Sequence, residues 1–132
     1  MKNFILVLLV IISFSSHAQN WADDNKLDEV LNNTSAFGDD ESPIIVLEYW
    51  AKFNEANSFS DWDKLSNIQY FRVDIAKAPR YKKEHRIRMA PTIIIWKGGI
   101  EKQWKAGLDL ECPVSLSELL EGIEEVNEAS AF

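Results

Sequence analysis

Few residues of this sequence could carry covalent or metal chemistry. Its 132 residues include one cysteine, Cys112, and two histidines, of which His17 lies in a stretch with the features of a leader. A single cysteine excludes a disulfide within one chain, a cysteine-rich zinc site and a CxxC redox pair. Cys112 could still form a mixed disulfide with a partner, but we favour the interpretation of a half-buried, inert thiol before Pro113. We expect no metal and no cofactor, and we assign His85 no catalytic role.

The charge balance limits the class of partner. The chain has 21 acidic and 14 basic residues, a formal charge of −7, whereas nucleic-acid binding needs a clustered basic surface. Residues 77–88 are the exception, with six bases against one acid. Their one aromatic residue, Tyr81, is too few for base stacking along single-stranded nucleic acid. We interpret this run first as a solvated face, with contact to acidic partners or phosphates as the alternative, and we expect no nucleic acid.

Residues 1–18 have the pattern of a signal peptide. Lys2 precedes an unbroken apolar run from Phe4 to Ile12, and Ser16-His17-Ala18 fits a small-x-small cleavage site. The run is shorter than the ~20 residues that cross a bilayer. We expect cleavage after Ala18, a secreted or periplasmic mature protein, and no stable membrane anchor after cleavage. An uncleaved anchor is the alternative.

The remaining chain predicts one domain with alternating strands and helices. Residues 19–42 form an N-terminal segment with one helix, capped by Asp23 or Asp24, and residues 129–132 form a tail. Between them, residues 43–128 form the core. Its expected strands are 44–51, 68–75, 92–96 and 100–106, with a type I′ turn at Gly98-Gly99. Its expected helices are 54–65, a short one within 77–88, and a closing helix after the capping box that begins at Ser115. A βαβ half followed by a ββα half makes one mixed sheet covered by helices.

Two segments of this order resemble the thioredoxin-like superfamily. Residues 44–53, IIVLEYWAKF, are similar to its central strand and Trp-Ala segment, and residues 85–99, HRIRMAPTIIIWKGG, to its proline loop, strand and hairpin. Val73-Asp74 and Lys105-Ala106-Gly107 resemble further strand ends. The similarity covers most of residues 24–126. It implies an α/β, thioredoxin-like fold with a central mixed sheet of about four to five strands flanked by helices.

The sequence departs from that superfamily at two places. The tetrapeptide that matches its CxxC pair is Asn54-Glu55-Ala56-Asn57, and an amide side chain cannot form a thiolate or attack a disulfide. The helix that follows is about two turns shorter than the superfamily usually shows. The resemblance therefore implies a divergent, redox-inactive thioredoxin domain, and we lean against an enzyme.

The resemblance also implies a binding surface around a cis-proline. Pro91 matches that proline, whose loop pairs with an extended peptide by strand addition; the alternative is a proline that only the turn needs. The expected binding residues are Trp50, Phe53, Asn54, Asn57, Met89, Ala90 and Pro91, although Trp50 could instead belong to the core. Glu48 matches the superfamily's buried acid, with a raised pKa and a vestigial proton role. Lys64 or another base could pair with it.

Three functions stay open at this point. The first is a redox-inactive domain that binds an extended peptide or protein at the proline loop. The second is a single-cysteine thiol oxidoreductase or covalent tether through Cys112. The third is a structural assembly subunit whose partner covers the sheet face left by the short helix. The sequence indicates no oligomeric state.

Overall fold

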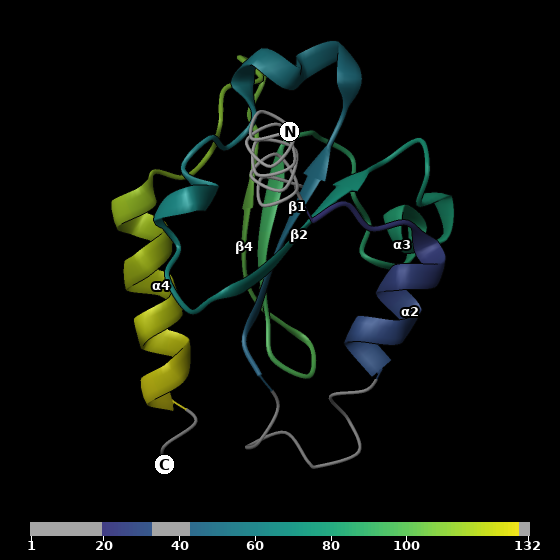
Figure 1. The fold of residues 1–132 in the computed structure, drawn as a ribbon. Coiled ribbons are helices and arrows are strands. Elements are labelled where there is room, and N and C mark those ends of the chain that lie inside the picture. Colours follow the sequence, from purple (N-terminus) through teal and green to yellow (C-terminus); the bar gives the residue numbers. More distant parts are fainter. Residues whose placement is uncertain (1–19, 33–42, 130–132) are drawn as a thin grey trace, which may run out of the picture.

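The computed structural model describes residues 20–32 and 43–129 (Figure 1). The expected signal peptide with its cleavage site, the loop at 33–42 and most of the tail lie outside the described residues. The N-terminal segment appears through α2 (Asp24–Asn32), and the rest of the fold begins at Pro43.

A four-stranded mixed sheet forms the centre of the molecule. Its strands are β1 (Ile45–Trp50), β2 (Gln69–Asp74), β3 (Thr92–Trp96) and β4 (Ile100–Lys105), in the order β2-β1-β3-β4. β1 and β2 are parallel, and the other pairs are antiparallel. The two central strands, β1 and β3, are the continuous apolar runs of the sequence, because strands covered on both faces have no solvated side. At the outer edge, Trp21 bridges to Arg72 of β2.

Helices cover both faces of this sheet (Figure 1). α2 and α3 (Pro79–Glu84) lie on one side, and α4 (Leu116–Ala129) lies on the other. Alternation along β1 divides the core accordingly: Leu47 and Tyr49 pack with the α2 side, and Val46 packs with Leu119 of α4. The structure thus confirms the α/β, thioredoxin-like architecture expected from the sequence.

The helix expected at 54–65 is wrong as one continuous helix. The segment instead forms two short 3-10 helices, η4 (Lys52–Asn57) and η5 (Trp62–Lys64). Asn54 has a non-helical φ of −125°, and the Phe59 N–H donates to the carboxylate of Glu48 (2.7 Å). A buried side chain therefore takes a backbone donor that a helix would have used. Phe59 and Trp62 are nevertheless buried.

The turn expected at Gly98-Gly99 also needs correction. The β3–β4 hairpin is present, but Trp96 pairs with Ile100 and only Gly98 of the two glycines has a positive φ (70°). A type I′ turn needs positive φ at both central residues, so this three-residue loop is not one.

Two residues of α4 differ in exposure. In this helix, Leu120 is 40% exposed and Gly122 is buried against the Trp104 side chain.

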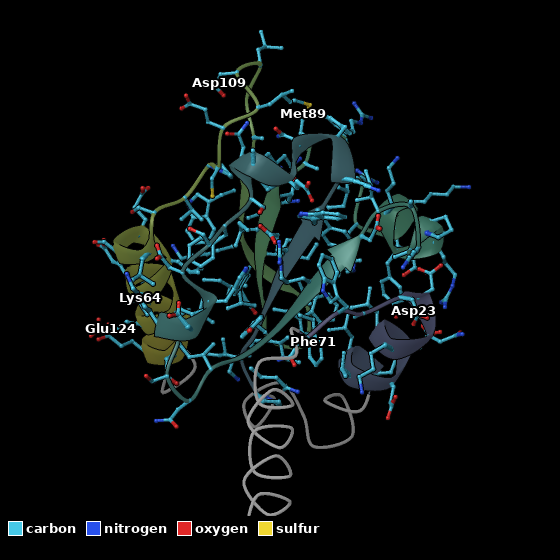
Figure 2. The ribbon with its side chains drawn as sticks, turned by 45° about the horizontal axis from the view of Figure 1, so that its top comes forward. Asp23, Lys64, Phe71, Met89, Asp109 and Glu124 are labelled. Carbon is cyan, nitrogen blue, oxygen red and sulfur yellow. The ribbon has the colours of Figure 1, made fainter. Side chains whose placement is uncertain are left out.

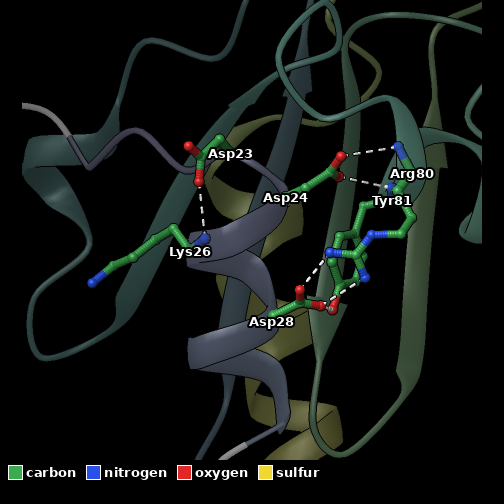
Figure 3. Close-up of polar contacts among 6 residues, drawn as sticks. All are labelled: Asp23, Asp24, Lys26, Asp28, Arg80 and Tyr81. Carbon is green, nitrogen blue, oxygen red and sulfur yellow. Dashed lines mark hydrogen bonds and ion pairs between the residues drawn. The ribbon is translucent and has the colours of Figure 1, made fainter.

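The α2 helix caps α3 from a distance (Figure 3). Ala78 precedes α3 and has no side chain that could accept a hydrogen bond, but the Asp24 carboxylate accepts from the N–H groups of Arg80 (3.1 Å) and Tyr81 (3.0 Å). Asp28, one turn further along α2, pairs with the Arg80 guanidinium and accepts from the Tyr81 hydroxyl (2.8 Å). The hydrogen bonds from Arg80 and Tyr81 lower the pKa of Asp28. These contacts hold the start of the basic run against the N-terminal segment.

Candidate functional site

The predicted site residues lie at one end of the sheet, where β1 ends and β3 begins. η4 follows β1 directly, and the proline loop, residues 89–91, leads into β3. The Ala90–Pro91 peptide bond is cis. Met89 and Asp109, the latter from the loop after β4, lie at the same end of the molecule (Figure 2). Three separate segments therefore meet here: η4, the proline loop and the loop after β4.

Asn54 joins these three segments. Its Nδ2 donates to the carbonyls of Ala90 (2.9 Å) and Leu110 (2.8 Å), and its Oδ1 accepts from Asn57 Nδ2 (2.8 Å). The Asn54 side chain is buried, whereas Asn57 is exposed. Both amide hydrogens of Asn54 are thus used inside the protein. We call the side chains of Asn54 and Asn57 the amide clasp; the sequence resemblance aligns these two positions with a CxxC pair.

The carbonyls of the proline loop have donors within the protein. The Met89 carbonyl accepts from Thr92 Oγ1 (2.6 Å), and the Pro91 carbonyl accepts from the Ala106 N–H (3.1 Å). The Ala90 carbonyl accepts from the clasp. Ala90 and Pro91 are themselves buried. An incoming strand would have to share or displace these donors in order to pair with the carbonyls.

The apolar residues at this end differ in exposure. Phe53 is 75% exposed, Met89 is half-buried, and Leu108 in the loop after β4 is fully exposed. Leu108 was not predicted from the sequence, because Cys112 was the candidate residue named in that loop. We call Phe53, Asn57, Met89 and Leu108 the proline-loop surface.

Trp50 is the last residue of β1 and packs beside a second tryptophan. It is half-buried and contacts the Trp21 ring edge-on, with centroids 5.0 Å apart. The two tryptophans line a pocket of about 560 Å³. Its charged lining residues are Asp23 just before α2, Lys26 of α2, Asp74 at the end of β2 and Lys77 in the turn that follows. Trp50 therefore lines this pocket beside Trp21, three residues before Phe53 of the proline-loop surface.

Glu48 is the buried acid that the sequence indicated. It is 0% exposed, and its carboxylate pairs with the Arg72 Nε (2.8 Å) and accepts from the Phe59 N–H (2.7 Å). Burial raises the pKa of Glu48, and the hydrogen bonds from Arg72 and Phe59 oppose that rise. Arg72 faces Glu48 directly across the parallel β1–β2 pair, a register that the sequence alone could not specify. Lys64 instead pairs with Asp61 (3.3 Å).

Cys112 lies in the loop that the clasp holds. Its side chain is half-buried against the core on the α4 side, and its Sγ–H donates to the Val114 carbonyl (3.3 Å). Burial is the main reason that the pKa of this thiol is raised. A raised pKa leaves less thiolate at neutral pH, and the thiolate is the reactive form.

Within residues 20–32 and 43–129, no three side chains of His, Cys, Asp or Glu are placed to hold a metal ion. Over the same described ranges, no helix has the length and apolar character needed to cross a membrane.

Comparison with solved structures identifies the fold. A thioredoxin variant from Entamoeba histolytica superposes with a TM-score of 0.53 at 18% identity, covering 82% of this chain and 99% of its own. Schistosoma mansoni thioredoxin gives a TM-score of 0.58 at 15% identity, over 80% and 94% of the two chains. Chlamydomonas reinhardtii thioredoxin f2 gives 0.59 at 8% identity, over 83% and 96%. The chain therefore has the thioredoxin-like fold.

No model of a protein family matches the sequence, and no curated protein matches it. At these identities the structural likeness concerns the fold, so function has to be argued from the site.

Proposed function

We propose that this protein is a thioredoxin-fold domain without dithiol redox chemistry, and that it binds a protein or peptide partner at the proline-loop surface. The amide clasp carries this proposal. The side chains at the sulfur positions are tied by hydrogen bonds into the protein, while the neighbouring Phe53 ring is 75% exposed. An exposed aromatic beside a fixed loop is typical of contact sites. From its leader pattern, we propose that the protein acts in a secreted or periplasmic setting.

The proposed contact relies on side chains more than on strand addition. Because the carbonyls of Met89, Ala90 and Pro91 each already accept one internal hydrogen bond, a strand that pairs with them would have to share each acceptor. The Phe53 ring and the half-buried Met89 side chain instead offer apolar area to a partner. We infer that an apolar group of the partner packs on Phe53.

Site-specific crosslinking tests the binding proposal. A photoreactive amino acid replaces Phe53 in one variant and Leu120 in the control, because Leu120 is an exposed apolar residue of α4. A discrete adduct from the Phe53 variant, absent from the Leu120 variant, is the expected result. Equal labelling from both positions, or none from Phe53, would contradict a binding role for this surface.

A reductase assay tests the loss of dithiol chemistry. We expect no reduction of insulin disulfides above background, because one cysteine cannot complete a dithiol cycle. Turnover that persists in a Cys112→Ser variant would refute the proposal.

The environment of Cys112 disfavours its alternative role as the centre of a single-cysteine thiol oxidoreductase or as a covalent tether. Its thiol is half-buried, donates to a backbone carbonyl and has a raised pKa, whereas reactive cysteines are accessible and have a lowered pKa.

A further inference from the structure

A group of basic side chains surrounds a hollow that no part of the proposed function uses. The hollow has a volume of about 370 Å³ and is lined by α3 and the residues that follow it: Pro79, Lys82, Lys83, Arg86, Ile87 and Arg88. Four of these six residues are basic and none is acidic. We call these six residues the basic hollow.

Among the residues that the structure describes, the bases of the basic hollow have no acidic partner. Several bases elsewhere pair with a carboxylate: Lys26 with Glu29, Lys64 with Asp61, Arg72 with Glu48, Arg80 with Asp28, and Lys102 with Glu125. In the described residues, 20–32 and 43–129, none of the four bases around the hollow forms an ion pair. Within these ranges no carboxylate neutralises their positive charge, which can therefore attract an anion.

The end of α3 explains only part of this cluster. Lys82 and Lys83 lie in the last helical turn, where bases interact favourably with the helix dipole. Arg86 and Arg88 lie beyond the helix. Arg86 has a φ of 56°, in the left-handed region where glycine is the usual residue after a helix. This backbone conformation ends α3, because the Ile87 N–H donates to the Lys82 carbonyl (2.9 Å), and Arg86 then lines the hollow together with Lys82 and Lys83.

The positive charge of the basic hollow stands out because the rest of the chain is acidic. Residues 77–88 contain six bases and one acid, although the whole chain has a formal charge of −7. An acidic partner would be repelled by most of the surface and attracted to this one part, which orients its approach.

The basic hollow is joined to the proline-loop surface through the chain itself. Arg88 lines the hollow, and the next residue, Met89, belongs to the proline-loop surface. Building on the proposed function, we propose that the partner is an acidic protein segment, whose carboxylates enter the basic hollow while its apolar side chains pack on Phe53 and Met89.

Two observations favour a protein segment over a nucleic acid. Tyr81, the one aromatic residue of the run, is 5% exposed and offers no face for a base to stack on. The exposed aromatic at this end is Phe53, which suits an apolar side chain beside an acidic one.

Fluorescence anisotropy with two labelled peptides tests the proposal. One peptide alternates Asp with Leu between Gly-Ser spacers, and the other carries Asn in place of every Asp. We expect the acidic peptide to bind more tightly, by about tenfold, and its affinity to fall with added salt. Arg86→Glu and Arg88→Glu should each weaken it about tenfold. Lys64→Glu, which makes the same change of charge on an exposed residue of η5, should leave it unchanged.

The outcomes separate the two proposals. Equal binding of both peptides, weakened by Phe53→Ala, overturns the acidic partner and leaves the proline-loop surface as a binding site. If neither peptide binds and the Phe53 crosslinker labels nothing, the proposed function fails as well. If inorganic phosphate, vesicles containing phosphatidylglycerol or a single-stranded oligonucleotide binds the hollow while the acidic peptide does not, the protein partner is refuted.

Discussion

Asn54 ties together three parts of the chain with one side chain. The Ala90 and Leu110 carbonyls and the Asn57 amide all depend on it, and the Asn54 side chain is buried. Where a thiol would be available for exchange, this amide is engaged in packing and hydrogen bonding. Burial and these hydrogen bonds therefore stabilise the protein at Asn54, whereas a reactive side chain at this position would have to be accessible.

Replacing Asn54 should cost stability. Asn54→Ala leaves the Ala90 and Leu110 carbonyls without their donor, so we expect the free energy of unfolding to fall by roughly 1–3 kcal/mol. Asn57→Ala removes one hydrogen bond at an exposed residue and should cost less than about 1 kcal/mol. Urea denaturation of both variants measures the difference. Equal losses would mean that the clasp contributes no more than a surface hydrogen bond.

Cys112 should react slowly in the folded protein. Since burial raises the pKa of its thiol, the alkylation rate with iodoacetamide should still rise with pH above the midpoint of a free cysteine. The same protein in urea is the matched control, where the rate should increase and its midpoint should shift down. A fast reaction at neutral pH in the native state would instead revive the single-cysteine function.

At the scale of elements, α3 depends on α2 for its start. The first N–H groups of a helix need acceptors, and Asp24 supplies one to Arg80 and Tyr81 from a separate helix (Figure 3). The placement of the basic run therefore depends on the N-terminal segment.

Removing this cap should weaken both helices together. We expect Asp24→Ala to lower the free energy of unfolding by about 0.5–2 kcal/mol, the usual range for a lost N-cap. Asn25→Ala, at the adjacent exposed position of α2, should change it by less than about 0.5 kcal/mol. Thermal unfolding followed by circular dichroism compares them, and an Asp24→Ala variant as stable as the control would show that the remote cap is dispensable.

Replacing Gly122 in α4 with alanine should change stability in the direction opposite to the usual one for a glycine in a helix. Gly→Ala in a helix normally stabilises by up to ~1 kcal/mol. Here a Cβ would lie 2.7 Å from the Trp104 ring and 3.1 Å from Ile95 Cδ1, so we expect Gly122→Ala to destabilise by about 1–3 kcal/mol. Leu120→Ala at an exposed position of the same helix is the control. A stabilised Gly122→Ala protein would show that α4 moves away from the sheet at little cost.

At the scale of the whole molecule, His85 links α3 to the sheet. Its Nδ1 lies 2.6 Å from the Tyr49 hydroxyl, and its ring contacts Tyr81 and Trp96. Burial lowers the pKa of His85, although the nearby Glu84 opposes this. The unfolded chain therefore binds a proton at His85 more readily than the folded protein does.

This difference predicts a pH dependence of stability. The contribution of His85 is present above the unfolded pKa of about 6.5 and is lost as the pH falls below that value toward the lower folded pKa. The free energy of unfolding should thus decrease on acidification from neutral pH. His85→Gln should flatten this slope, with His17 common to both proteins. Parallel slopes for the two proteins would contradict the assignment.

Local patterns in the sequence predicted most of the elements. The apolar runs of β1 and β3 indicated central strands, because only strands covered on both faces lack a polar side. The capping box was also correct: the Glu118 N–H donates to Ser115 Oγ (3.2 Å), and the Ser115 N–H donates to the Glu118 carboxylate (3.3 Å). Each of these signals acts between neighbours in the chain.

The sequence by itself shows one cysteine, Cys112, and it shows amides at Asn54 and Asn57, the two positions that its resemblance aligns with a CxxC pair. Only the tertiary structure decided what those amides do, because their partners at Ala90 and Leu110 lie 36 and 56 residues further along the chain. The pairing of Arg72 with Glu48 and the contact of Trp50 with Trp21 depend on the tertiary structure in the same way. Hydrogen bonds and packing between distant segments depend on strand register and loop approach, and a local pattern does not contain either of them.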